Sequence, residues 1–217
     1  MNTESTAHEI GAGQYDDAYA QCNLLWGKHP ASNVIKASSF FDDMSQKTAL
    51  DLGCGEGKNS IFLASKGFQV KSIDISEIAI EKAKRIWQNW QKIDWQTADI
   101  RNFSQQNPQQ YHVVLLTGPL HCFSSKNDVI HTIENAKSLT KIGGINVISV
   151  FNSREQDFSG HSKLFKPLLL PHEFYTQCYL NNWEIIEESD TDLADCHPHN
   201  NIPHKHSITR IIARRIT

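Results

Sequence analysis

The chain has 217 residues, of which 39% are hydrophobic and 21% are charged, as is ordinary for a globular protein with a substantial core. Its formal net charge of −3 at pH 7 provides no overall attraction to nucleic acid, and no apolar run approaches the roughly 20 residues that span a bilayer. The polar segment 1–10 has the pattern of neither a signal peptide nor a transit sequence. We therefore expect a cytoplasmic protein, monomeric or homodimeric, with no nucleic-acid or membrane partner.

The cysteines predict neither a disulfide framework nor a zinc ribbon. There are five of them, they are widely scattered, and no two form a Cys-x-x-Cys pair. Such a set is typical of reduced thiols in a cytoplasmic protein.

The first 44 residues predict a helical preamble that can act as a lid on the main domain. Within it, residues 15–27 indicate an aromatic-rich helix and turn, and residues 31–41 a second helix. From residue 49 onward, strand and helix signals alternate. The expected strands are 49–52, 68–75, 93–97, 113–116 and 145–150, and the expected helices are 59–66, a helix capped by Ser76 that carries Trp87 and Trp90 on its buried side, and 125–139.

The alternation ends after residue 150. Residues 151–182 are polar and irregular, apart from a helix at 172–180, and we expect them to form an insertion that binds the acceptor. Strands at 183–187 and 207–213 predict an antiparallel hairpin at the sheet edge, with a loop over 191–206 between them. The whole pattern predicts an α/β fold with a doubly wound, mostly parallel, seven-stranded sheet in a single Rossmann-like domain over residues 1–217.

The segment Asp51–Gly57, read as Asp-Leu-Gly-Cys-Gly-Glu-Gly, lies between the first predicted strand and the next helix. Glycines at alternate positions let the backbone turn sharply and approach a ligand closely. The spacing is tighter than the Gly-x-Gly-x-x-Gly of a dinucleotide site, and an acidic residue before the first glycine suits a cationic ligand. The helix that begins near Asn59 directs its free N–H groups toward an anion, such as the carboxylate of an amino acid. This combination points to S-adenosylmethionine.

Acidic residues lie at the carboxyl ends of three successive predicted strands, where doubly wound sheets bind their ligands. Asp51 adjoins the glycine loop, Asp74 can accept both ribose hydroxyls, and Asp99, followed by Ile100, suits the adenine amino group and ring face. The alternative is that these residues only cap helices or begin turns.

Together these residues resemble the class I S-adenosylmethionine-dependent methyltransferases over about residues 48–150, through Leu50–Gly57, Ile73–Ser76, Ala98–Ile100 and Lys141–Gly144. The stretch Glu56–Ser60, the aromatic preamble and the closing strands are similar to the tellurite-resistance and thiopurine S-methyltransferase branch. The resemblance implies that S-adenosylmethionine, and its product S-adenosylhomocysteine, are bound by Asp51, Gly53, Cys54, Gly55, Gly57, Asn59, Asp74, Ile75, Asp99, Ile100, Thr117 and Gly118.

The sequence also departs from related patterns. Members of the tellurite branch often carry an Arg-Tyr pair where this chain has Ala18-Tyr19. Residues 117–123 differ from the Asn/Asp-Pro-Pro-Tyr/Phe signature of enzymes that methylate nucleobase amines, which argues against a DNA or glutamine acceptor.

His121 follows the strand that normally lies under the transferred methyl group and is the candidate catalytic residue, either as a base or by orienting the substrate. The alternative is that its ring only packs.

The expected acceptor-binding residues come from the preamble, from the segment after the fourth strand, from the insertion and from the C-terminal strands. They are Tyr15, Tyr19, Trp26, Cys122, Phe123, Arg154, His204 and His206. The aromatic residues can instead pack the preamble on the sheet, and Arg154 can be a lone surface residue. The histidines at 197, 199, 204 and 206 admit three interpretations: an exposed loop, a substrate-facing strand or a metal site. We predict no metal.

We therefore predict methylation of a small molecule with a soft nucleophile, namely a thiol, a thiopurine or a chalcogen oxyanion. One alternative is an O- or N-methyltransferase of a metabolite that uses His121 as its base. Another is a non-catalytic sensor that binds S-adenosylmethionine.

Overall fold

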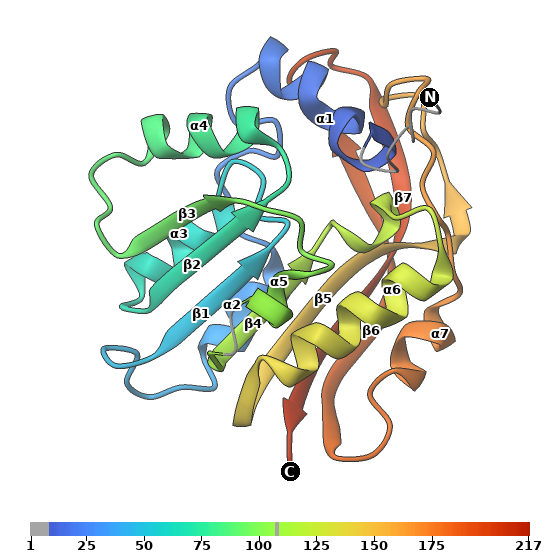
Figure 1. Ribbon diagram of the computed structural model, residues 1–217. Helices are drawn as coiled ribbons and strands as arrows, with labels where there is room; N and C mark the ends of the chain where they lie inside the picture. The colour runs from blue at the N-terminus through green and yellow to red at the C-terminus, as the bar shows by residue number, and fades with distance from the viewer. Residues whose placement is uncertain (1–8, 107–108) are drawn as a thin grey trace, which may run out of the picture.

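Seven strands pair into one sheet in the order β3-β2-β1-β4-β5-β7-β6, and helices cover both of its faces (Figure 1). This computed structural model describes residues 9–106 and 109–217, so the first eight residues of the expected preamble lie outside it. The strands are β1 (Thr48–Leu52), β2 (Gln69–Asp74), β3 (Ile93–Thr97), β4 (Tyr111–Thr117), β5 (Thr140–Gln156), β6 (Trp183–Cys196) and β7 (Pro203–Arg215). The helices are α1 (Glu9–Gln21), α2 (Ser32–Ser38), α3 (Lys58–Ser65), α4 (Glu77–Ile86), α5 (Phe103–Gln106), the 3-10 turn η1 (Leu120–Cys122), α6 (Lys126–Ser138) and α7 (His172–Gln177).

The strand directions agree with the prediction. Strands β1 to β5 pair in parallel, whereas β7 runs antiparallel to both β5 and β6. The C-terminal hairpin therefore lies at the sheet edge, with β7 inserted between β5 and β6. This arrangement is an α/β doubly wound sheet with one antiparallel margin.

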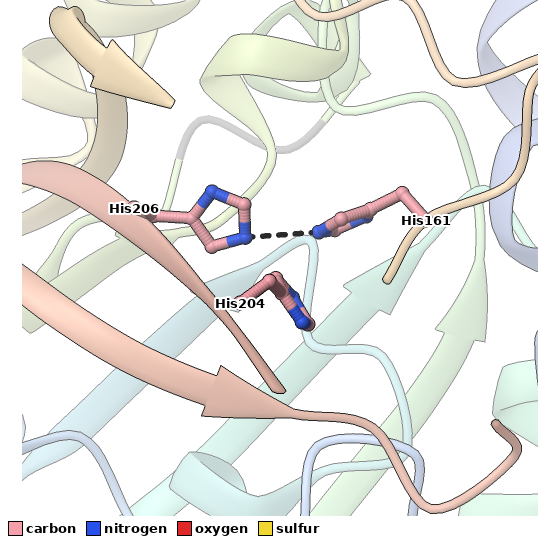
Figure 2. Close-up of side chains that lie close together, drawn as sticks. All are labelled: His161, His204 and His206. Carbon is pink, nitrogen blue, oxygen red and sulfur yellow. Dashed lines mark hydrogen bonds between the residues drawn. The ribbon is translucent and has the colours of Figure 1, made fainter. Parts of the chain in front are cut away.

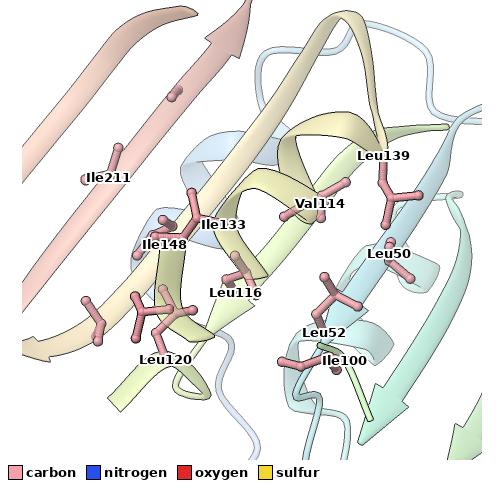
Figure 3. Close-up of a cluster of buried hydrophobic side chains, with 14 of the residues drawn as sticks. Leu50, Leu52, Ile100, Val114, Leu116, Leu120, Ile133, Leu139, Ile148 and Ile211 are labelled. Atoms are coloured by element: carbon pink, nitrogen blue, oxygen red, sulfur yellow. The ribbon is translucent and has the colours of Figure 1, made fainter. Parts of the chain in front are cut away.

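Alternation along the central strands divides the core between the two faces of the sheet. Leu50 and Leu52 of β1 pack on one face with residues of α6 and α7, and Ala49 packs on the other with residues of α2 and α3. Figure 3 shows the first of these clusters, where Leu50, Val114 and Ile148 come from three neighbouring strands and Ile133 from the covering helix. Because both faces are buried, the central strands are almost continuously apolar.

Side-chain caps fix the starts of two helices at the residues that the sequence indicates. The Ser76 hydroxyl accepts from the N–H of Ala79 at 3.1 Å and caps α4, which confirms the predicted cap. Ser125 caps α6 in the same way through the N–H of Asp128. Among the described residues, no helix is both long enough and apolar enough to cross a membrane.

The last three strands are much longer than predicted. β5 continues through Phe151 to Gln156, so these residues belong to the sheet and not to the expected irregular insertion. β6 and β7 together turn most of the predicted 191–206 loop into paired strand. Edge strands rich in polar residues lack the apolar alternation on which the prediction depended, and pairing with β7 decides their length.

Trp90 is a second correction. The helical spacing predicts it as a core residue, yet α4 ends at Ile86 and Trp90 is 38% exposed. Trp87 remains partly buried, and its indole N–H donates to the carbonyl of Glu56 at 2.8 Å.

Candidate active site

A cavity of about 490 Å³ opens at the carboxyl ends of the parallel strands. Its lining includes eleven of the twelve residues expected to bind the cofactor, all except Asp51, together with Tyr15, Tyr19, Trp26, His121, Cys122 and Phe123. The volume suits a nucleoside-sized ligand with a small second molecule. Figure 1 shows α1 on the side of the sheet where the parallel strands end.

The glycine loop is a tight backbone turn, and the side chains of three ring-containing residues pack against its glycines. Gly53 and Cys54 both donate their backbone N–H to the carbonyl of Ile73, at 2.8 and 3.0 Å, which fastens the loop to β2. Gly57 has φ +86° and is the N-cap of α3. A Cβ atom would lie 2.6 Å from Pro119 at Gly53, 2.8 Å from the Tyr19 hydroxyl at Gly55 and 2.2 Å from Trp95 at Gly57. Side chains at these positions are therefore excluded by packing as well as by backbone conformation.

Asp74 joins the end of β2 to this loop. Its Oδ2 accepts from the N–H of Gly55 at 2.7 Å, and its Oδ1 accepts from the N–H of Ser76 at 2.9 Å. Burial raises its pKa, and the backbone hydrogen bonds oppose that rise. Each carboxylate oxygen has a second lone pair, so Asp74 can still accept the hydroxyls of a ribose from the cavity that it lines.

Asp51 differs from its expected role. It is fully buried beneath the loop and does not line the cavity. Its Oδ2 accepts from the Ser60 hydroxyl at 2.6 Å, and burial raises its pKa to about 6. The fourth residue of β1 points to the face covered by α2 and α3, because side chains alternate along a strand, and Asp51 there contacts the start of α3 through Ser60.

Asp99 lies at the cavity with its carboxylate already engaged. The Arg101 guanidinium binds it through Nε and Nη2, the latter at 2.5 Å, and the Arg101 backbone N–H donates to Oδ1 at 2.9 Å. Ile100 is 7% exposed and also lines the cavity. Ile100 therefore offers an apolar wall to a flat ring, and Asp99 is oriented by its own turn.

Asn59 ties the preamble to the sheet at the start of α3. Its Oδ1 accepts from the N–H of Ala31 at 2.9 Å, and its Nδ2 donates to the Thr117 hydroxyl at 2.8 Å. Thr117 and Gly118 end β4 and line the cavity beside it. One amide side chain thus brings together the second segment of the preamble, the first helix of the main domain and the central strand.

A buried ion pair holds the turn that follows α1. Glu56 accepts from the backbone N–H of Leu24 and of Leu25, and it pairs with Lys82 of α4 at 2.9 Å. Lys82 also donates to the carbonyls of Tyr19 and Cys22. Leu24 has φ +55°, a conformation that costs an L-residue energy, and the Glu56 carboxylate stabilises it. The preamble is therefore fastened to the glycine loop.

Aromatic residues of this preamble face the cavity, as expected. The Trp26 indole N–H donates to the Tyr19 hydroxyl at 3.0 Å, and the Tyr15 ring meets Trp26 edge-on at 5.1 Å between centroids. Tyr19 is 5% exposed, so these rings pack the preamble on the domain and line the ligand cavity at the same time.

His121 is buried and lines the cavity. Burial lowers its pKa to about 3, and its ring stacks on Phe151 at 4.1 Å. The Nδ1 atom accepts from the Phe151 N–H over 3.4 Å, which leaves the proton of the neutral ring on Nε2. Such a ring donates a hydrogen bond readily and is a weak base. Burial likewise raises the pKa of Cys122 to about 12, so Cys122 is a thiol.

Three of the expected acceptor-binding residues do not line the cavity. Arg154 lies outside the cavity and pairs with Asp190 and Asp192 of the edge strand β6, because β5 continues to Gln156 and carries it away from the strand ends. His204 and His206 are buried on β7 behind the cavity wall and do not lie in an exposed loop. Arg154 is therefore a paired surface residue, and the histidines contribute to the interior.

Arg210 lines the cavity, whereas Arg154 does not. It is partly buried on β7, and its Nη1 donates to the Thr191 hydroxyl at 2.7 Å. It makes no ion pair within the part of the chain that the structure describes. Burial lowers its pKa, although a guanidinium stays charged at neutral pH.

Further lining residues are not among the predicted site residues. Lys58, Ser76 and Arg101 lie in or beside the predicted motifs, whereas pairing of β5, β6 and β7 brings five others to the cavity, namely Phe151, Leu193, Asp195, Ile208 and Arg210. The available signal was the period of two along β7, which places Ile208 and Arg210 on one face. Only the actual length of β6 and β5 shows that this face meets the cavity.

Comparison with known proteins identifies the family of this chain. The family model described as tellurite resistance protein TehB matches residues 16–204. TehB of Haemophilus influenzae, a probable S-adenosyl-L-methionine-dependent methyltransferase, is 27% identical over 153 residues, which are 68% of this chain and 49% of that protein. YqeM of Bacillus subtilis is 36% identical over 104 residues, which are 48% of this chain and 42% of that protein. The chain thus spans about half the length of the curated relatives it matches.

Solved structures show the same fold. The crystal structure of Haemophilus influenzae TehB superposes with a TM-score of 0.67 at 23% identity, covering 85% of this chain and 62% of that one. The N-methyltransferase NodS of Bradyrhizobium japonicum, solved with S-adenosyl-L-homocysteine, superposes with a TM-score of 0.66 at 17% identity, covering 97% of both chains. These likenesses establish the class I methyltransferase architecture.

Proposed function

This chain belongs to the tellurite resistance protein TehB family, and we propose that it transfers the methyl group of S-adenosylmethionine to a small molecule with a soft nucleophilic atom. The glycine loop, Asp74 and Ile100 are the residues that would hold the cofactor. Two features support the fit. Ring-containing side chains pack on the glycines of the loop, and Asp74 has lone pairs that remain free for the ribose hydroxyls. When bound, the cofactor supplies a methyl group on a positively charged sulfonium.

The neutrality of His121 is the observation that carries the choice of acceptor. In methyl transfer, the lone pair of the acceptor forms a bond to the methyl carbon while the carbon–sulfonium bond breaks. A base is needed only for an acceptor that arrives protonated and weakly nucleophilic. His121 has a pKa near 3 and Cys122 has a pKa near 12, so neither side chain can remove a proton efficiently at neutral pH. An acceptor that is already a thiolate or a chalcogen anion needs no such help.

Arg210 supports an anionic acceptor. Arg210 lines the cavity, and its guanidinium has no carboxylate partner within the described chain. A partly buried cation without a counter-ion attracts an anion and lowers the pKa of a nearby thiol, which increases the thiolate fraction. The apolar wall of Phe151 and Ile208 beside it suits a soft, weakly hydrated atom. The residues of the chain therefore position the acceptor and favour its anionic form. Holding the acceptor atom close to the methyl group then supplies much of the rate acceleration.

The proposal is tested first by calorimetry with S-adenosylhomocysteine and then by an acceptor panel of thiols, selenite, tellurite, phenols and amines. We expect binding, and methylation of the sulfur or chalcogen members. Arg210→Ala is expected to raise KM for anionic acceptors about tenfold or more while leaving S-adenosylhomocysteine affinity unchanged. Arg154→Ala, on the same sheet but outside the cavity, is the matched control.

Two outcomes would contradict the proposal. A well-folded protein that binds neither S-adenosylmethionine nor its product has a different function. Turnover confined to phenols or amines, and abolished by His121→Gln, would establish the O- or N-methyltransferase alternative and a base at His121.

A further inference from the structure

Four histidines from separate segments converge behind the acceptor side of the cavity. We call His161, His197, His204 and His206 the histidine cluster. His161 belongs to the segment after β5, His197 follows β6, and the other two lie on β7, where positions 204 and 206 share one face. Figure 2 shows three of these rings close together, with the hydrogen bond between His161 and His206 drawn as a dashed line. The exposed fractions are 2% for His197, 5% for His204 and 0% for His206.

The nitrogen atoms of the cluster have the spacing of metal ligands. His161 Nε2 lies 3.0 Å from His206 Nε2 and 3.4 Å from His197 Nε2. The ligand atoms of His161, His204 and His206 all lie within 4.8 Å of one another. In a tetrahedral zinc site with Zn–N bonds of about 2.0–2.1 Å, neighbouring nitrogens are about 3.3 Å apart. The separations of 3.0 and 3.4 Å lie close to that value.

The tautomer of His206 is set by its neighbour Gln156. The Gln156 amide NH₂ donates to the carbonyls of Asn152 and Ser207, both at 2.8 Å, so its Oε1 faces His206. Oε1 accepts from His206 Nδ1 at 2.8 Å. The proton of the neutral His206 ring is therefore on Nδ1, and the lone pair on Nε2 points into the cluster.

His204 is fixed in the same tautomer. Its Nδ1 donates to the carbonyl of Ile202 at 2.7 Å, which leaves a lone pair on Nε2. That Nε2 is buried and has no hydrogen-bond partner within the described chain. Gly160 packs directly on this ring, since a Cβ there would lie 2.3 Å from it. The cluster thus contains two oriented imidazole lone pairs, one of which is unsatisfied, and such a buried acceptor calls for a ligand.

We propose that His161, His204 and His206 bind one divalent transition-metal ion, with Zn²⁺ the expected occupant and His197 in the fourth position. Nitrogen donors of this kind suit zinc and its neighbours and not Mg²⁺ or Ca²⁺, which require oxygen ligands.

The position of the ion defines its role. Phe151 lines the cavity and is stacked between His121 and His206, at 4.1 Å from each ring. Trp26, another lining residue, meets His197 edge-on at 5.2 Å. The histidines themselves do not line the cavity. The ion therefore joins the segment after β5 to β7 and fixes the acceptor wall from behind, as a structural site.

Untagged full-length protein provides the test. After treatment with EDTA and removal of the chelator, the protein is loaded with Zn²⁺, desalted and analysed for metal by mass spectrometry. We expect one equivalent per chain, and with Co²⁺ the visible absorption of tetrahedral coordination. Competition with a chromophoric chelator then gives the affinity. His206→Ala and His161→Ala are expected to weaken it by at least about 100-fold, and Gln156→Ala by about 10- to 100-fold through the loss of ring orientation.

Two controls make the result specific. His131→Ala removes an exposed histidine on α6 and is expected to leave zinc affinity unchanged. Asp195→Asn tests the competing group of Asp195, His197 and His204, and is also expected to have no effect. Calorimetry with S-adenosylhomocysteine on the same samples reports folding and the cofactor site independently. Loading below about one-tenth of an equivalent, or equal affinities in wild type and His206→Ala, would overturn the proposal.

Discussion

The backbone N–H of Gly55 donates to the Asp74 carboxylate over 2.7 Å, and this bond joins the glycine loop to the end of β2. The same carboxylate accepts from Ser76, the N-cap of α4. Asp74 therefore organises the loop and the next helix before any ligand arrives. Asp74 also lines the cavity, and its remaining lone pairs are available to a ligand there. We therefore expect its substitution to lower cofactor affinity more than the stability of the fold.

Asp74→Asn tests that relationship. The loss of a charged acceptor is expected to cost about 1.5–3 kcal/mol of binding energy, or roughly 10- to 100-fold in S-adenosylhomocysteine affinity, measured by calorimetry. Asp94→Asn, on β3 with a side chain 67% exposed, is the matched control and should bind normally. Equal affinities for the two variants would mean that Asp74 does not contact the cofactor.

Gly57→Ala is expected to destabilise the protein and weaken cofactor binding together. At φ +86° a Cβ atom would overlap Trp95 at 2.2 Å, and that ring cannot move without disturbing the core. Gly143→Ala, at φ +77° with open space around it, should cost only the backbone strain of about 1 kcal/mol. Thermal unfolding of both variants measures the difference, and a Gly57→Ala protein no less stable than Gly143→Ala would contradict this packing argument.

The Glu56–Lys82 pair should be among the most sensitive polar contacts of the preamble. Glu56→Ala leaves Lys82, whose side chain is 10% exposed, without its counter-ion, and frees the strained turn at Leu24. Breaking a buried pair in this way is expected to cost about 3–5 kcal/mol in urea unfolding. Glu81→Ala breaks the exposed pair with Lys84 on the same helix and should cost well under about 1 kcal/mol. Similar losses in the two variants would refute the proposed anchoring role.

The pH dependence of stability should report the buried His121. Its folded pKa near 3 lies below the usual 6.5, so the unfolded chain takes up a proton that the folded chain does not. Stability is therefore complete above pH 6.5 and falls as the pH drops toward 3, by up to about 1.4 kcal/mol per pH unit. His121→Phe, studied with EDTA present, should lose about 1–2 kcal/mol less than wild type between pH 7 and pH 5. Parallel pH profiles would show that His121 ionises normally in the folded protein.

Local patterns in the sequence were sufficient to predict most of the residues that line the strand-end side of the cavity. The glycine spacing, Asp74, Asn59 and Thr117 all lie within a few residues of predictable strand ends, and parallel strands bring their carboxyl ends to one edge. Ser76 was sufficient to predict the start of α4, because an N-cap bonds a backbone N–H only three residues away. Such features are decided over short distances along the chain.

The acceptor half was decided only by tertiary structure. The sequence contains Arg154, Arg210 and the histidines, but their surroundings depend on how far β5, β6 and β7 pair with one another. Strand pairing places Arg154 beside Asp190 of β6, outside the cavity, and brings Arg210 to the cavity. It also buries His204 and His206 beside His161, more than forty positions earlier in the sequence. The length and register of these strands depend on many contacts between residues that are far apart in the sequence. Local sequence patterns therefore cannot predict them.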